Sequence, residues 1–201
     1  MEKGMLIVIA GPSGVGKGTV KCELLKRNQN LVESISVTTR KPRPMEIDGV
    51  SYYFKSEKEF DDLILENQFL EYCGVFERRY GTLREFVDEK LAEGKDVLLE
   101  IDVQGALKVR GTKQDAVLIM LVPPSLPDLV LRLQKRNTET EDEIKKRFAK
   151  AKIEMEQFRN FDYIVINDDI ETACKKIESI IKNERYRSSR NTELIGRIIN
   201  Q

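Results

Sequence analysis

Histidine is absent from the 201-residue chain, and cysteine is scarce, with Cys22, Cys73 and Cys174 widely separated. The lack of histidine excludes Ser-His and Cys-His nucleophilic systems, histidine-ligated zinc sites and the most common general base. The cysteines form no C-x-x-C pair of the kind that binds zinc or undergoes redox cycling. We therefore expect reduced cysteines that serve packing, and a chemistry that needs no histidine.

Long hydrophobic runs and an excess of one charge are also absent. The apolar runs at residues 5–10 and 116–122 are too short for a membrane-spanning helix or a typical signal sequence. Basic and acidic residues number 34 each, so no overall positive field would attract nucleic acid or an anionic membrane. With 40% hydrophobic residues the chain can bury one sizeable core. These features predict a single cytoplasmic unit that binds neither nucleic acid nor membrane.

The most informative segment reads G-P-S-G-V-G-K-G-T and follows the first apolar run directly. A buried strand that leads into a glycine-rich turn and then a helix directs several backbone N–H groups and the positive helix end at one point, where a polyphosphate can bind. The spacing predicts a P-loop, in which Lys17 adds a charge for the β and γ phosphates. Its candidate triphosphate-binding residues are Gly11, Ser13, Gly14, Val15, Gly16, Lys17, Gly18 and Thr19.

One position departs from the usual P-loop. Gly18 stands where a serine or threonine hydroxyl normally binds Mg²⁺, and the hydroxyl comes one residue later, on Thr19. The G-K-G-T ending resembles the loop of nucleoside monophosphate kinases, whose metal is held largely by waters and by the nucleotide. We therefore expect no direct protein ligand for Mg²⁺. A switch GTPase is disfavoured by Gly18 and by the lack of an N-K-x-D motif.

The apolar pattern predicts an α/β fold with a parallel sheet covered by helices on both faces. Strand-like runs occupy residues 5–10, 97–101, 116–122 and 163–166, and segments of helical periodicity separate them. The helical candidates are residues 18–27, 83–93, 126–136, 141–158 and 170–188. Ser125 and Thr140 stand where N-caps would be expected.

Two segments interrupt this alternation. Residues 34–82 carry alternating patterns, as at residues 34–39 and 69–73, and predict a small antiparallel insert. Residues 131–147 place basic side chains on both sides of a polar turn, and we predict a mobile lid there.

Six segments, in this order, closely resemble the guanylate kinase family. They are the P-loop, S-V-T-T-R-K-P-R-P-M-E-I-D-G-V-S-Y-Y-F from Ser36, F-L-E-Y-C-G-V-F-E-R-R-Y-G-T from Phe69, L-L-E-I-D-V-Q-G from Leu98, R-L-Q-K-R-N-T-E-T from Arg132 and I-N-D-D from Ile166. The resemblance extends from the first strand to about residue 185. It implies one unit over residues 1–201, with a core of residues 1–33, 83–125 and 159–201, a GMP-binding subdomain of residues 34–82 and a lid of residues 126–158.

The insert contains a candidate site for the GMP phosphate. Arg40 and Arg43 lie three residues apart around a proline-containing turn, so their guanidinium groups can converge on one phosphate. Tyr52 and Tyr80 can add hydroxyl donors. Taken alone, such arginines would more often be solvated surface charges and such tyrosines core residues, and it is the resemblance that favours the phosphate site.

Glu71 is the candidate reader of the base. A carboxylate accepts two parallel hydrogen bonds from guanine N1–H and the exocyclic N2 amine, whereas adenine presents an acceptor at that edge. Ser36 and Thr82 would contact the rest of the base. An isolated glutamate would more often be an exposed strand residue, but a buried group left unpaired by the wrong base can discriminate by about 10⁴-fold.

Glu100 and Asp102 end an apolar strand and should project at the carboxyl edge of the sheet, where open α/β sheets bind ligands. The resemblance places Asp102 between GMP and a water bound to Mg²⁺, with Glu100 near, although Asp102 could also cap a helix. It places Asn167 and Asp168 near the adenine of ATP.

The implied reaction is ATP + GMP to ADP + GDP by in-line transfer, with Mg²⁺ accompanying ATP. Because the second pKa of a phosphate monoester is about 6, this acceptor needs no histidine base. Catalysis would rest on positioning and charge neutralisation. The candidate catalytic cations are Lys17, Arg43, Arg136 and Arg147, with Arg132 in support. Arg136 and Arg147 belong to the predicted lid, where they could instead pair with nearby glutamates.

Two alternatives stay open at this point. A kinase for AMP, UMP or dTMP is the nearest, and Glu71 with Ser36 argues against it. A guanylate-kinase-like scaffolding domain that binds protein partners would lack a working P-loop, whereas Gly16, Lys17 and Thr19 are intact here. The residues do not decide whether dGMP replaces GMP, or whether the chain is a monomer or a homo-oligomer.

Overall fold

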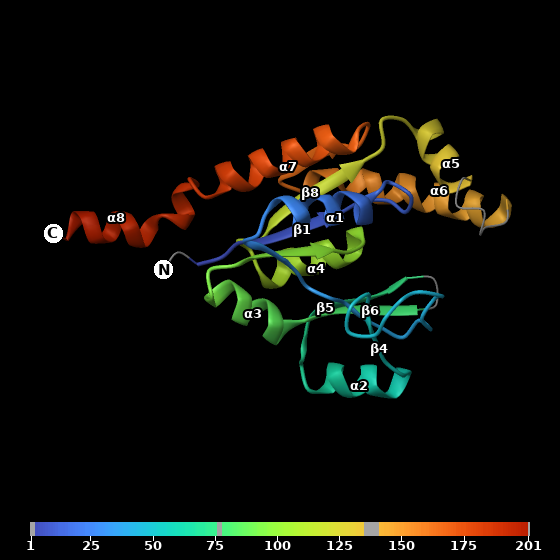
Figure 1. Cartoon of the computed structure of the whole chain (residues 1–201), viewed down its shortest axis with the longest axis horizontal. Helices are drawn as coiled ribbons and strands as arrows, with labels where there is room; N and C mark the ends of the chain where they lie inside the picture. Colours follow the sequence, from blue (N-terminus) through green and yellow to red (C-terminus); the bar gives the residue numbers. More distant parts are fainter. Residues whose placement is uncertain (1–2, 76–77, 135–140, 201) are drawn as a thin grey trace.

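The computed structural model describes residues 3–75, 78–134 and 141–200 of the chain. Its central layer is a parallel sheet with the strand order β2–β7–β1–β8–β9 (Figure 1). The strands are Leu31–Glu33 (β2), Asp96–Glu100 (β7), Leu6–Ala10 (β1), Val117–Val122 (β8) and Tyr163–Ile166 (β9). All four predicted strands are present. The short edge strand β2 was not predicted, because three residues carry too little pattern.

Helices cover both faces of this sheet, as predicted. Alternate residues of β1 enter opposite cores: Ile7 and Ile9 pack with α1 (Lys17–Arg27) and α7 (Ile170–Glu184), whereas Leu6 and Val8 pack with α3 (Arg84–Ala92) and α4 (Val103–Thr112). A central parallel strand buried on both sides reads as a continuous apolar run, which explains the sequence of β1. The helix α4 was not predicted, because its two glycines weaken the helical pattern.

The insert holds a second sheet with the order β4–β3–β6–β5, covered by α2 (Glu57–Leu65). Its strands are Val37–Thr38 (β3), Tyr53–Phe54 (β4), Phe69–Val75 (β5) and Arg78–Leu83 (β6). The pairs β5–β6 and β3–β6 are antiparallel, but β3 and β4 run parallel. The long connection between β3 and β4 allows this, since parallel neighbours need about a dozen linking residues. A capping box of Ser56 and Glu59, a signal present in the sequence, starts α2.

Two helices form the segment predicted as a lid. The helices α5 (Leu126–Gln134) and α6 (Glu141–Glu156) pack through Leu129, Leu133 and Ala151, and a short 3-10 helix, η1 (Gln157–Asn160), follows α6. The Ser125 hydroxyl accepts a hydrogen bond from the Asp128 N–H at 3.2 Å, as an N-cap does. Thr140 and Arg136 lie outside the described residues. None of the helices in the described ranges combines the length and apolar character that a membrane crossing needs.

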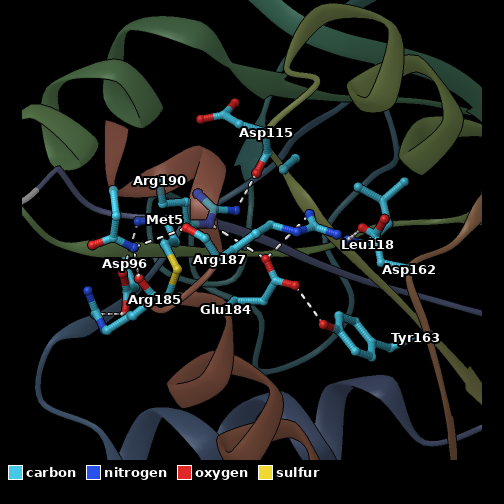
Figure 2. A network of polar contacts seen from close by, with 12 residues as sticks. Met5, Asp96, Asp115, Leu118, Asp162, Tyr163, Glu184, Arg185, Arg187 and Arg190 are labelled. Atoms are coloured by element: carbon cyan, nitrogen blue, oxygen red, sulfur yellow. Dashed lines mark hydrogen bonds and ion pairs between the residues drawn. The ribbon is translucent and has the colours of Figure 1, made fainter. Parts of the chain in front are cut away.

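At the amino ends of the strands, a polar network ties the C-terminal segment to the sheet (Figure 2). The buried carboxylate of Asp96 accepts from the Met5 N–H at 2.9 Å and from Arg185 at 2.6 Å. Glu184, also buried, accepts from the Tyr163 hydroxyl at 2.6 Å. After α7 the chain continues through a short 3-10 helix, η2 (Ser188–Arg190), into α8 (Thr192–Ile199), which projects beyond the sheet in Figure 1.

Replacing Asp96 by alanine should lower the free energy of unfolding by about 3 kcal/mol, because it leaves the Met5 N–H and the Arg185 guanidinium without this acceptor. Urea denaturation followed by circular dichroism measures the loss. The matched control is Asp88→Ala, which removes a half-exposed ion pair with Lys113 and should change stability by less than about 0.5 kcal/mol. Equal effects of the two changes would contradict a structural role for this network.

Candidate active site

The P-loop joins β1 to α1 at the carboxyl edge of the sheet. Gly11 passes so close to β8 that a Cβ on it would lie 2.2 Å from the Leu121 carbonyl oxygen. Gly16 has a φ of 96°, in the left-handed region, and directly precedes α1. Lys17 turns back over the loop, and its ammonium donates to the carbonyl oxygens of Gly11 at 2.7 Å and Pro12 at 3.3 Å. The loop thus presents its amide edge and a lysine at one place.

Arg132 and Asn167, both predicted as site residues, support the P-loop through hydrogen bonds to its backbone. The carbonyl oxygen of Val15 accepts from Asn167 Nδ2 at 2.8 Å and from Arg132 at 3.2 Å. Arg132 also donates to the Asn167 carbonyl at 2.8 Å, which links α5, the end of β9 and the loop. Asn167 is buried, while Asp168 is exposed and accepts from the N–H of Asp169. In this arrangement Arg132 and Asn167 position the loop.

A cleft of about 290 Å³, here called the basic cleft, brings together side chains from the P-loop, the insert and α6. It is lined by Gly11, Ser13, Lys17, Arg40, Arg43, Arg78, Tyr80, Asp102, Arg147, Lys150 and Glu154. In Figure 1 the insert lies below the sheet, and α5 and α6 lie toward the upper right of the view. Arg147 of α6 donates to the Ser13 hydroxyl of the P-loop at 2.8 Å. Six cationic side chains and two carboxylates face this one space, which suits a strongly anionic ligand.

The basic cleft contains eight predicted residues that come from distant parts of the sequence, among them Lys17, Arg43 and Arg147. Arg78 and Lys150 also line it and were not predicted. Both had a signal in the sequence. Arg78 lies two residues before Tyr80 on a strand, and Lys150 lies one helical turn after Arg147, so each shares a face with a predicted residue.

Arg40 is held in the insert by a bidentate ion pair. Its guanidinium donates to both Glu46 oxygens at 2.9 and 2.8 Å and lies 5.2 Å from the centre of the Tyr52 ring. The hydrogen bonds with Glu46 raise the pKa of Arg40 further above its usual range, and they lower the pKa of Glu46. The N–H of Arg43 donates to the same carboxylate at 2.7 Å. Glu46 therefore holds the two arginines of the turn together.

A second space, the acidic cavity, adjoins the basic cleft through the edge-to-face rings of Tyr52 and Tyr80. It measures about 240 Å³ and is lined by Lys21, Glu33, Ser34, Ser36, Glu46, Ser51, Tyr52 and Glu100. The Lys21 ammonium lies 2.5 Å from Glu33 and 3.0 Å from Glu100. Burial by itself would lower the pKa of Lys21, but Glu100 and Glu33 outweigh burial and raise it.

Glu100 also faces the start of α1. Its carboxylate lies 3.6 Å from the point where a Cβ on Gly18 would be, and Thr19 is exposed on the helix. Within the described ranges no group of three or more acidic or thiol side chains is arranged to hold a metal ion. At the start of α1 the Glu100 carboxylate is thus present without the hydroxyl that usually stands at the position of Gly18.

The buried Glu71 of the insert and the half-buried Asp102 at the start of α4 form a carboxylate pair. Glu71 is 5% exposed, and its Oε1 accepts from the Thr82 hydroxyl at 2.8 Å. Asp102 caps α4 by accepting from the Gly105 N–H at 2.8 Å. Within the described residues, Glu71 Oε2 and Asp102 Oδ2 have no hydrogen-bond partner. Burial raises the pKa of the Glu71 carboxyl to about 7; the Thr82 hydroxyl opposes this rise and Asp102 adds to it.

Known proteins resemble this chain in sequence and in fold. The family model described as guanylate kinase matches residues 3–184. A guanylate kinase from Caldanaerobacter subterraneus subsp. tengcongensis is 49% identical over 197 residues, which cover 98% of this chain and 96% of the relative. One from Clostridium tetani is 50% identical over 190 residues, covering 94% and 91%.

Solved structures show the same fold. The crystal structure of guanylate kinase from Anaplasma phagocytophilum superposes with a TM-score of 0.79 at 31% identity and covers 94% of this chain and 90% of that one. The SH3-kinase fragment of tight junction protein 3 reaches a TM-score of 0.50 at 10% identity, covering 92% and 58%. That second likeness concerns the fold alone.

The raised pKa of Glu71 predicts that the free energy of unfolding depends on pH. Because the folded-state pKa of about 7 lies above the ordinary value of 4.5, the folded protein holds this proton more tightly than the unfolded chain. Stability should therefore fall as pH rises from 4.5 to 7, by about 3 kcal/mol in all, and level off above that range. Urea unfolding of the protein and of Glu71→Gln at several pH values measures the difference. Glu89→Gln, at an exposed site, is the control, and a constant difference between Glu71→Gln and the parent would contradict the shift.

Proposed function

The chain belongs to the guanylate kinase family and is an ATP:GMP phosphotransferase, and we propose that the basic cleft is where the phosphates of its two nucleotides meet. The observation that carries this proposal is the convergence of six cationic side chains from the P-loop, the insert and α6 on one space. The triphosphate of ATP and the single phosphate of GMP supply negative charge that neutralises these side chains.

The P-loop side of the cleft receives ATP. The amide edge of residues 11–18 surrounds the β phosphate, and Lys17 leaves the carbonyl oxygens of Gly11 and Pro12 to reach the β and γ oxygens. Arg147, now on the Ser13 hydroxyl, is within the same space and moves to the transferring group. Arg132 and Asn167 keep the loop in shape, and the exposed Asp168 lies beside the adenine.

The insert side receives GMP. Arg40, Arg43 and Tyr80 bind its phosphate, with Tyr52 next to them and Arg78 as an added cation. Glu46 holds Arg40 in a fixed orientation before the substrate arrives, so less rotamer freedom is lost on binding. Glu71, Thr82 and Ser36 contact the base. The unpartnered Glu71 Oε2 is suited to this role, because a buried acceptor without a donor gains most from guanine N1–H and the N2 amine.

Transfer then needs little covalent help from the protein. The GMP phosphate is already ionised near neutral pH, so a chain without histidine can align it with the γ phosphate and neutralise the charge that develops. Lys17, Arg43 and Arg147 provide that charge in the cleft, and Arg136, which lies outside the described residues, remains a proposed fourth cation.

Mg²⁺ fits this site as a companion of ATP. Gly18 offers no hydroxyl, and Glu100 is the carboxylate that faces the start of α1. Glu100, with Asp102 nearby, would accept hydrogen bonds from the waters that accompany the metal. The metal would lower the negative charge on the transferring phosphate.

The same proposal covers the organisation of the chain. Residues 34–82 act as the GMP-binding subdomain, and residues 126–158 act as a lid that brings Arg147 to the phosphates. In this proposal the enzyme works in the cytoplasm, and dGMP is a candidate second acceptor.

Replacing Lys17 by methionine should lower kcat by at least about 100-fold, because one phosphate contact in the transition state is lost, while GMP binding stays as it was. A coupled assay for ADP gives kcat, and isothermal titration gives the dissociation constant for GMP. Lys175→Met removes an exposed lysine of α7 and should leave both unchanged. Full activity of the Lys17 variant would refute the P-loop assignment.

Replacing Glu71 by glutamine should lower kcat/KM for GMP by about 10- to 100-fold, because the amide presents a donor to guanine where a carboxylate accepts. Activity with AMP should change little, so the preference for GMP over AMP narrows. The same assay with GMP, dGMP and AMP measures it, and Glu89→Gln serves as the control. An unchanged preference would place base recognition elsewhere.

A further inference from the structure

Gly105 occupies a position where glycine is locally unfavourable. It lies in the first turn of α4, three residues after the capping residue Asp102, and it is buried. Inside a helix, alanine is more favourable than glycine, because glycine loses more backbone freedom on folding. No positive φ or turn at Gly105 requires glycine. The reason for it must lie in what surrounds the residue.

Two carboxylates occupy the space that a side chain at Gly105 would need. A Cβ built on Gly105 would lie 2.9 Å from Glu71 Oε2 and 3.3 Å from Asp102 Oδ1. Real Cβ atoms essentially never approach another heavy atom within 3.0 Å, so Glu71 would have to move. It is poorly able to do so, since it is 5% exposed and its other oxygen is bonded to Thr82 at 2.8 Å.

One of the two crowded oxygens, Glu71 Oε2, has no hydrogen-bond partner among the described residues. The other, Asp102 Oδ1, accepts from the Gly105 N–H at 2.8 Å, which leaves Asp102 Oδ2 without a partner there. Gly105 therefore leaves room for Glu71 because it has no side chain, and it holds Asp102 through its backbone N–H. Together these contacts set how the two carboxylates lie relative to each other.

We propose that Gly105 is a positioning residue for guanine recognition: its lack of a side chain keeps Glu71 Oε2 and the Asp102 carboxylate where they can accept hydrogen bonds from the base. The inference rests on the proposed role of Glu71 as the reader of the base. It adds a specificity determinant that never contacts the nucleotide.

The chain provides a matched control in the same helix. Gly111 also lies in α4, but a Cβ built on it would meet nothing within 4 Å. Gly105→Ala and Gly111→Ala thus make the same chemical change in one helix, with and without a carboxylate in the way.

Steady-state kinetics separates positioning from general damage. Gly105→Ala should raise KM for GMP by about 10-fold or more, leave KM for ATP within about twofold, and narrow the preference for GMP over AMP. Gly111→Ala should leave all three unchanged. If Glu71→Gln raises KM for GMP but Gly105→Ala does not, this inference fails while the role of Glu71 stands. If neither variant changes KM for GMP, the proposed role of Glu71 fails as well.

A second measurement covers the case in which Gly105→Ala folds poorly. Gly105→Ala is also made in a Glu71→Ala background, where Glu71 Oε2, the oxygen within 3.0 Å of the new Cβ, is absent. Gly105→Ala should lower Tm in the parent by several degrees but leave Tm unchanged or higher in the Glu71→Ala background. An equal fall in both backgrounds would overturn the proposal, because the cost would then not pass through Glu71.

Discussion

Crowding of like charge is the constraint on which the rest of this structure depends. Six cationic side chains face one cleft of about 290 Å³, and among its described lining residues Asp102 and Glu154 are the carboxylates that oppose them. Repulsion between like charges is stronger in a partly enclosed cleft than in open water, so the fold has to hold the cations in place. It does so with partners within the protein. Lys17 donates to P-loop carbonyls, Arg40 to Glu46, and Arg147 to the Ser13 hydroxyl. The partners of Lys17 and Arg147 are uncharged, so in the proposed site phosphate oxygens replace them, whereas Glu46 stays on Arg40 and keeps it oriented.

The parallel sheet places these charges where they are needed. Because the carboxyl ends of β1 and β7 are neighbours, the P-loop and the pair Glu100 and Asp102 share one edge. The amino ends carry no such chemistry. There Asp96 and Glu184 are buried and bonded, and they fix the C-terminal segment to the sheet. Buried carboxylates that accept hydrogen bonds from the protein hold the fold at one edge, and the charged side chains of the proposed nucleotide site gather at the other.

The sequence predicted the parts whose signal is local. Continuous apolar runs revealed the four longer strands of the parallel sheet, and glycine and lysine spacing revealed the P-loop. Three features depended on contacts between distant residues and could not be read in this way. The short strand β2 exists because β7 offers it a partner, and β3 pairs parallel with β4 because the intervening segment is long enough to return. Arg132 was predicted to support catalysis through the phosphates, but its contacts to Val15 and Asn167 depend on how α5 packs over the loop.

Two glycines carry information that neither helix propensity nor turn chemistry explains. Gly18 lies within α1 and Gly105 within α4, and both are adjacent to a carboxylate: Glu100 in the first case, Glu71 and Asp102 in the second. A side chain at Gly18 would meet Glu100 at ordinary contact distance, whereas one at Gly105 would collide with Glu71. The same residue type therefore has different meanings. At Gly18 a side chain would fit with little strain, so the effect of glycine there is chemical: the hydroxyl is missing. At Gly105 the absence is steric, and it keeps open the position of Glu71, the carboxylate that we propose distinguishes guanine from adenine.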